Sequence, residues 1–199
     1  MPRPPLRRCF RLEGRGGAMI ELATVDIFPR ALGERCLAWC LEEAEAHPQP
    51  SAERIAWYHQ VAVRGGRSLG ITRGNYCASA QSRAMLECLL PGDVKPHEPR
   101  AAVIELQGDA ARARRWRPIG DARNGRWRPA PGDLAVYDRS SPGAAGTVWW
   151  RHVDRVIQVA IDDARYENIG GNEAGGGWRR EWTSFGHPRL LGFIDYGQP

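Results

Sequence analysis

The chain has 199 residues, of which 42% are hydrophobic and 26% charged, a composition typical of one globular domain and not of a disordered or fibrous chain. The 28 basic residues exceed the 23 acidic ones and leave a net charge of +5. This charge favours polyanionic partners, such as nucleic acid, anionic lipid or bacterial cell wall, without choosing among them. No stretch approaches the roughly 18 consecutive apolar residues that span a bilayer, so we expect no membrane span.

The N-terminal segment 1–18 is basic and lacks the apolar run of about 7 to 15 residues that a secretory signal requires. We therefore expect synthesis in the cytoplasm without a signal peptide. Segment 1–18 is predicted to be disordered or untranslated, with translation starting at Met1 or at Met19. Residues 19–199 are then a single domain. The five cysteines form an odd number, which favours free thiols over a disulfide framework.

The first half of the chain predicts three helices. Residues 31–46 carry leucines and cysteines at helical spacing with acids on the opposite face. Ser51 is a suitable N-cap for a second helix, which the glycines at 65–66 would end. The run CASAQSRAMLECLL predicts a third helix over 77–90, one face of which has small residues and can pack tightly on a sheet.

The second half predicts a sheet. Residues 92–131 are rich in Pro, Arg and Gly, and we expect connecting structure there with one strand, AAVIEL. Beyond them Asp162 and Asp163 suit a hairpin turn between two strands. Helices followed by antiparallel strands indicate an α+β fold. The predicted strands are GDLAVYD, TVWWRHVDRVIQVAID, RYENIGGN and RLLGFIDY.

Cys77 is the candidate nucleophile, because it is predicted in the first turn of a helix, where backbone N–H groups and the helix dipole favour a thiolate. His152, in a predicted strand, is the candidate general base. A third polar group must orient the imidazole. The following strand offers Asn172, Glu167 and Asn168; we take Asn172 first, since the glycines before it allow a constrained turn, and Glu167 second.

The order of four pieces, NYCASA, RPAPGDLAVYD, RHVDRVIQV and ENIGGN, resembles the CHAP amidase and peptidase domains, which are related to the NlpC-type papain-like cell-wall hydrolases. The resemblance implies Cys77 as nucleophile, His152 as general base and Asn172, or else Glu167, as the orienting residue. Two positions depart from the family pattern. Tyr76 stands where the family usually has Trp, and Asp154 stands where it usually has a small residue. Asp154 is expected on the same strand face as His152, about 7 Å further along the strand.

The resemblance also implies a papain-like α+β fold with N-terminal helices packed on a central antiparallel sheet. The implied activity is that of a peptidoglycan hydrolase, either an N-acetylmuramoyl-alanine amidase or an endopeptidase, which works through an acyl-enzyme. Such a protein acts in the periplasm or cell wall after lysis, as an endolysin, or after injection, as an interbacterial effector with an immunity protein as partner. Peptidoglycan is the expected partner, and no cofactor or metal is expected because the sequence has no acidic calcium-binding cluster.

Two other functions fit parts of the sequence. Arginine and tryptophan alternate over 111–128, which suits a non-catalytic module that binds cell wall or nucleic acid, although a solvated loop explains this run more simply and nucleic acid is not the expected partner. A thiol peptidase acting on proteins would share the Cys and His pair. Cys36, Cys40 and Cys88 are interpreted as small core residues, and Asp133 as a turn residue that launches a strand.

Overall fold

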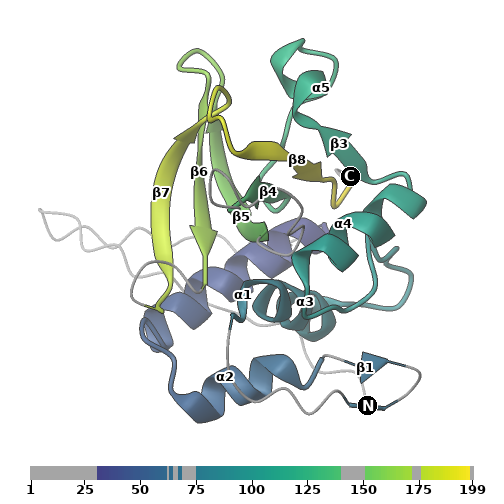
Figure 1. Ribbon diagram of the computed structural model, residues 1–199, viewed down its shortest axis with the longest axis vertical. Coiled ribbons are helices and arrows are strands. Elements are labelled where there is room, and N and C mark those ends of the chain that lie inside the picture. Colours follow the sequence, from purple (N-terminus) through teal and green to yellow (C-terminus); the bar gives the residue numbers. More distant parts are fainter. Residues whose placement is uncertain are drawn as a thin grey trace, which may run out of the picture.

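The computed structural model describes residues 31–61, 75–139, 151–171 and 176–197, and the backbone of 63–64 and 67–68. In these residues a group of helices packs against one face of a six-stranded antiparallel sheet, which confirms the predicted α+β class (Figure 1). Segment 1–18, Met19 and Asn172 lie outside the described residues. In the described part no helix is both long and apolar enough to cross a membrane.

Four helices precede the first strand of the six-stranded sheet, and the first three begin where the sequence predicts. In α1 the buried cysteines recur at helical spacing on the face that meets α3. The hydroxyl of Ser51 accepts a hydrogen bond from the Arg54 N–H and so caps α2. The bounds are α1 Leu32–Ala46, α2 Ala52–His59 and α3 Cys77–Cys88.

The sheet has the strand order β3-β8-β4-β5-β6-β7. Its long central hairpin, β5 and β6, turns at Asp162 and Asp163 as predicted. Leu134 pairs with Arg155 and Tyr137 with His152, which fixes the register of the two central strands. The bounds are β3 Trp116–Pro118, β4 Leu134–Asp138, β5 Arg151–Ala160, β6 Arg165–Gly170, β7 Arg179–Ser184 and β8 Leu190–Ile194.

The expected strand AAVIEL is wrong, because these residues begin a helix, α4 (Val103–Arg112). Val103 and the next residue are β-branched and favour a strand locally, but Val103, Leu106 and Ala110 are buried at helical spacing. The burial of this face outweighs the local preference. The elements β3, β7 and the short helix α5 (Ile119–Arg123) are not among those that the sequence predicts.

The second helix is shorter than predicted. It ends at His59, and Val63–Arg64 instead forms β1, which pairs with β2 (Arg67–Ser68). Valines at 61 and 63 lose side-chain freedom in a helix and favour extended backbone, which accounts for the early end.

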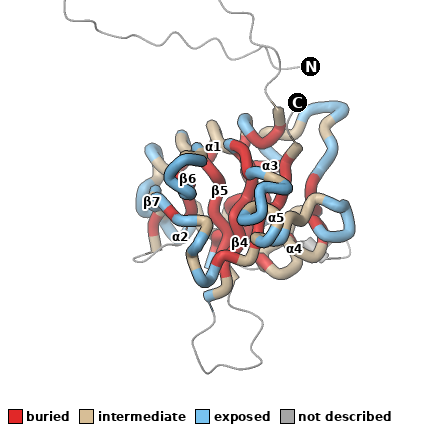
Figure 2. The backbone as a smooth tube through the Cα atoms, turned by 90° about the horizontal axis from the view of Figure 1, so that it is seen from above, coloured by how far each residue is buried: buried red, intermediate tan, exposed pale blue. Residues whose placement is uncertain are grey.

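Side chains alternate between the two faces of the sheet and form two separate apolar clusters. The helix face carries Val136, Val153 and Ile169, which pack with α1, α3 and α4. The second face carries Tyr137 and Tyr166, together with the aromatic cluster beneath α5. Figure 2 shows that buried residues concentrate in β4 and β5, whereas β7 is largely exposed and α5 has no buried residue.

Candidate functional site

Cys77 is the first residue of α3, where the sequence predicts it, and its side chain is buried. It belongs to the apolar cluster of the helix face, together with Val153 and Ile169. Among the described residues no hydrogen bond joins its thiol to another side chain. The structure thus gives Cys77 the expected place at a helix N-terminus, in an apolar setting.

His152 and Asp154 form a buried pair on β5. The imidazole Nε2 lies 2.5 Å from the carboxylate Oδ1, and each residue is only 2% exposed. Residues two apart on a strand share a face, so the sequence correctly places Asp154 beside His152. A carboxylate this close to one ring nitrogen fixes the orientation of the imidazole.

Gly170 makes room for this pair. A Cβ at this position would lie 1.7 Å from the Asp154 Oδ1 and 3.2 Å from the His152 Nε2. The next residue, Gly171, faces the other way, and a Cβ there would lie 2.6 Å from the ring of Tyr76, which caps α3. Glycine is therefore required at 170 and 171, because side chains pack closely against the backbone from both sides.

Strand alternation places the Cys77 cluster and the His152 imidazole on opposite faces of β5. Val153 packs in the same cluster as Cys77 on the helix face, and His152, one residue earlier, points to the second face beside Tyr137. The expected dyad would require the two side chains to meet from opposite faces of β5. The pair that the structure does assemble is His152 with Asp154.

A pocket of about 420 Å³ opens on the second face over this pair. Its walls come from the ends of β4 and β5, from β7 and from the loop that precedes β8. It contains both acidic and basic groups, and His187 packs edge-on against the Tyr137 ring with 5.9 Å between centroids. The lining residues are Tyr137, Asp138, Arg139, His152, Asp154, Glu181, Trp182, Thr183, Ser184, His187 and Arg189.

A buried hydroxyl network lies beside the pair. Asn168 donates from Nδ2 to the hydroxyls of Tyr137, at 2.7 Å, and Thr183, at 3.1 Å. The Tyr137 hydroxyl also lies 2.7 Å from that of Tyr166. Burial raises the pKa of both tyrosines, so each keeps its proton at neutral pH.

Either hydroxyl can be the donor in the hydrogen bond between Tyr137 and Tyr166. Tyr137 and Thr183 both accept a hydrogen bond from Asn168 and both line the pocket, so two neutral hydroxyl groups lie together at its wall.

The candidate orienting residues of β6 have different places. Glu167 lies on the helix face, where its carboxylate accepts hydrogen bonds from Arg180 at 2.9 Å and from Gln158 at 2.8 Å. It therefore points away from His152. Asn168 shares the face of His152 but reaches Tyr137 and Thr183 instead of the ring, and its Oδ1 has no partner among the described residues. Asn172 lies outside the described residues.

Sequence reasoning did not single out Tyr137 or Thr183. Tyr137 could have been found, because alternation along the predicted strand GDLAVYD places Ala135 and Tyr137 on the same face of the sheet. Thr183 lies in β7, whose sequence RREWTS has no apolar alternation. The described residues contain no cluster of three or more His, Cys, Asp or Glu side chains that could hold a metal ion.

Comparison with known proteins adds no further relationship: no protein family, curated protein or solved structure matches the chain. The likeness to CHAP domains therefore rests on the four sequence pieces.

Proposed function

We propose that this chain is a hydrolase that cleaves an amide bond in the peptide part of peptidoglycan, with His152 as general base and Asp154 as the residue that orients it. The observation that carries the proposal is the buried 2.5 Å contact of this pair beneath a pocket of about 420 Å³. A carboxylate on one ring nitrogen fixes the tautomer and stabilises the imidazolium that forms during proton transfer. The choice of peptidoglycan comes from the resemblance to CHAP domains.

The pocket residues suit the steps of amide hydrolysis. His152 takes a proton from the nucleophile as the nucleophile attacks the amide carbonyl. The hydroxyl of Tyr137 or Thr183, both of which line the pocket, stabilises the oxyanion that develops on the carbonyl oxygen. The imidazolium then returns its proton to the leaving amine.

The nucleophile has two candidates. A water molecule that entered the pocket would lie on the same face as His152 and would need no rearrangement. Cys77 is the nucleophile that the resemblance implies, and it is the first residue of α3. Its apolar surroundings and the intervening strand favour the water route.

We further propose a papain-like arrangement of the helices and the sheet, because α3 packs against the central strand β5. The protein would act on the wall as an amidase or endopeptidase, in the periplasm or cell wall after lysis or injection. An effector role would add an immunity protein as partner.

The test is to incubate purified sacculi with the wild type and with His152→Gln, Cys77→Ala and His47→Gln, and to analyse the released fragments by mass spectrometry. His47 ends α1 and serves as a matched histidine control away from the pocket. We expect wild type, H47Q and C77A to release fragments whose masses name the bond, and H152Q to release at least about 100-fold less.

Three results would change this proposal. Loss of activity in a folded C77A would establish the thiol mechanism and require Cys77 and His152 to meet. Sacculi that bind the wild type but stay uncut would overturn the hydrolase and favour a binding module, and digestion of casein with intact sacculi would indicate a peptidase that acts on proteins.

A further inference from the structure

The pocket contains a second imidazole, that of His187, which lies in the loop between β7 and β8. Its ring packs edge-on against the Tyr137 ring, and the centroid of the His152 ring lies 6.3 Å from that of the same tyrosine. The two histidines therefore flank one side chain at the wall of the pocket. The steps of hydrolysis proposed above use only His152.

A backbone hydrogen bond fixes which nitrogen of His187 carries the ring proton. The Arg189 N–H donates to the Nδ1 of His187 at 3.2 Å. Because a backbone N–H can only donate, Nδ1 is the acceptor, and the proton of the neutral ring is on Nε2. In the described part of the chain Nε2 has no hydrogen-bond partner. His187 thus offers an N–H donor at the outer end of a ring that lines the pocket.

The loop that carries His187 is held in place by hydrogen bonds. The Arg123 guanidinium of α5 donates to the Phe185 carbonyl at 3.0 Å and to the His187 carbonyl at 3.4 Å. The Asp138 N–H, at the end of β4, donates to the Arg189 carbonyl at 2.8 Å. A donor held in this way needs no rearrangement when negative charge develops on a substrate, which is the condition for electrostatic catalysis.

The partners of the two imidazoles suit them to different tasks. His152 lies 2.5 Å from the Asp154 carboxylate, which stabilises the protonated ring and so suits a general base. His187 accepts a backbone hydrogen bond at Nδ1, which requires this nitrogen to be unprotonated and suits a neutral donor.

We propose that His187 is a further catalytic residue of the hydrolase, and that its Nε2–H donates a hydrogen bond to the carbonyl oxygen of the scissile amide. The inference rests on the proposed function, because it assigns His187 a role in the same reaction. His152 moves the proton, while His187, together with the hydroxyl of Tyr137 or Thr183, stabilises the oxyanion. No covalent bond to His187 forms or breaks.

Steady-state kinetics of the full chain on soluble wall fragments tests this role with wild type, His187→Ala, His187→Gln and the control His47→Ala. We expect H187A to lower kcat about 100-fold, the usual cost of removing one oxyanion donor, and to change KM less than about twofold. H187Q restores an N–H donor and should recover at least about 10-fold of that loss. His47 does not line this pocket, so H47A should keep full activity.

Three kinetic results would overturn the inference. A kcat of H187A within about twofold of the wild-type value would remove the role of His187 while the hydrolase stands. Equal losses in folded H187A and H187Q would show that the ring acts only by packing on Tyr137. A wild type that cuts no wall fragment would overturn the proposed function and this inference together.

A measurement on the wild type depends neither on activity nor on the folding of a variant. In protein labelled with ¹⁵N-histidine, nuclear magnetic resonance identifies the protonated nitrogen of each ring, and the signals missing from H187Q are those of His187. We expect the neutral ring to carry its proton on Nε2. A proton on Nδ1 instead would overturn the proposal even where hydrolysis is observed.

Discussion

The imidazole of His152 and the carboxylate of Asp154 lie 2.5 Å apart on the face of the sheet opposite α3. Gly170, on the neighbouring strand, leaves just the space that this contact occupies. The pair is therefore held by the backbone of β6 as well as by its own strand. This arrangement can be disturbed without changing either functional group.

Gly170→Ala should lower hydrolysis of sacculi by about 100-fold or more, because its Cβ would displace the Asp154 carboxylate from the imidazole. The Asp154 side chain is short and can turn away from the new methyl group. We therefore expect the free energy of unfolding to fall by less than about 2 kcal/mol. Gly120→Ala, whose Cβ would meet nothing within 4 Å, is the matched control and should retain activity. Full activity in G170A would show that the contact is not needed.

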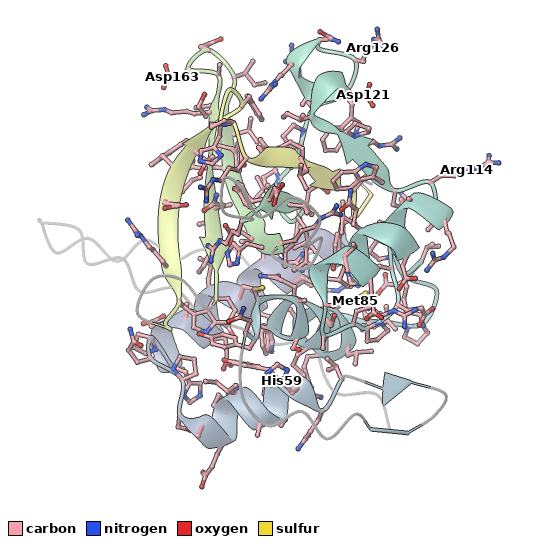
Figure 3. All side chains as sticks on the ribbon, viewed as in Figure 1. His59, Met85, Arg114, Asp121, Arg126 and Asp163 are labelled. Atoms are coloured by element: carbon pink, nitrogen blue, oxygen red, sulfur yellow. The ribbon has the colours of Figure 1, made fainter. Side chains whose placement is uncertain are left out.

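Asp154→Asn tests the role of the carboxylate itself. The amide cannot stabilise an imidazolium, so we expect kcat/KM to fall about 100-fold or more with little change in KM. Asp163→Asn is the control, since Asp163 lies at the tip of the β5–β6 hairpin and points away from the body of the molecule (Figure 3). Steady-state kinetics on soluble wall fragments measures both. An unchanged kcat in D154N would mean that Asp154 has only a packing role.

Gly132→Ala should be among the most destabilising small substitutions in the chain. Gly132 has φ +96° and a Cβ there would lie 2.3 Å from the backbone of Gly33 in α1. Gly92 has nearly the same φ, +94°, but open space around it. Urea unfolding should show a loss of about 1 to 2 kcal/mol for Gly92→Ala and at least about 2 kcal/mol more for Gly132→Ala. Equal losses would mean that α1 does not pack on this turn.

His97 should make the fold sensitive to acid. It is buried with its Nε2 2.7 Å from the Tyr196 hydroxyl, and burial lowers its pKa to about 4 from an ordinary value of 6.5. Between these two values the unfolded chain binds a proton that the folded chain does not, so stability falls as the pH drops from about 6.5 to 4. By pH 4.5 the loss from this residue is about 2 to 3 kcal/mol.

Urea unfolding of wild type and His97→Gln at pH 7.5 and 4.5 measures the loss of stability that comes from His97, because all other titrating groups are common to both proteins. We expect the wild type to lose more stability than the variant over this interval. Equal losses would show that the protonated ring is accommodated in the fold.

The local elements were predictable where burial and local preference agree. The start of α3 at Cys77 and the β5–β6 hairpin follow from patterns within a few residues. The helix that begins at Val103 was not predictable in this way, because its β-branched residues favour a strand locally. The helix is favoured only when the burial of Leu106 against the core is included. That contact is made by tertiary packing and is invisible in a local window.

The site was predictable only in part, for a related reason. Strand periodicity places Asp154 on the same face as His152, and the structure confirms it. Periodicity within one strand cannot say which face the helices will cover, so the sequence alone did not separate His152 from Cys77. Thr183 comes from a strand that the sequence did not indicate at all.

The two glycines at 170 and 171 have a further consequence. Neither residue has a side chain. Only the backbone of Gly170 and Gly171 therefore separates Tyr76, the N-cap of α3, from the His152 and Asp154 pair. A methyl group at 171 presses on Tyr76, and one at 170 presses on Asp154. Alanine at 171 would therefore disturb the side of the sheet that carries Cys77, and alanine at 170 the side that carries His152. Comparing the activities of the two variants separates the contribution of the thiol from that of the imidazole without removing any polar group.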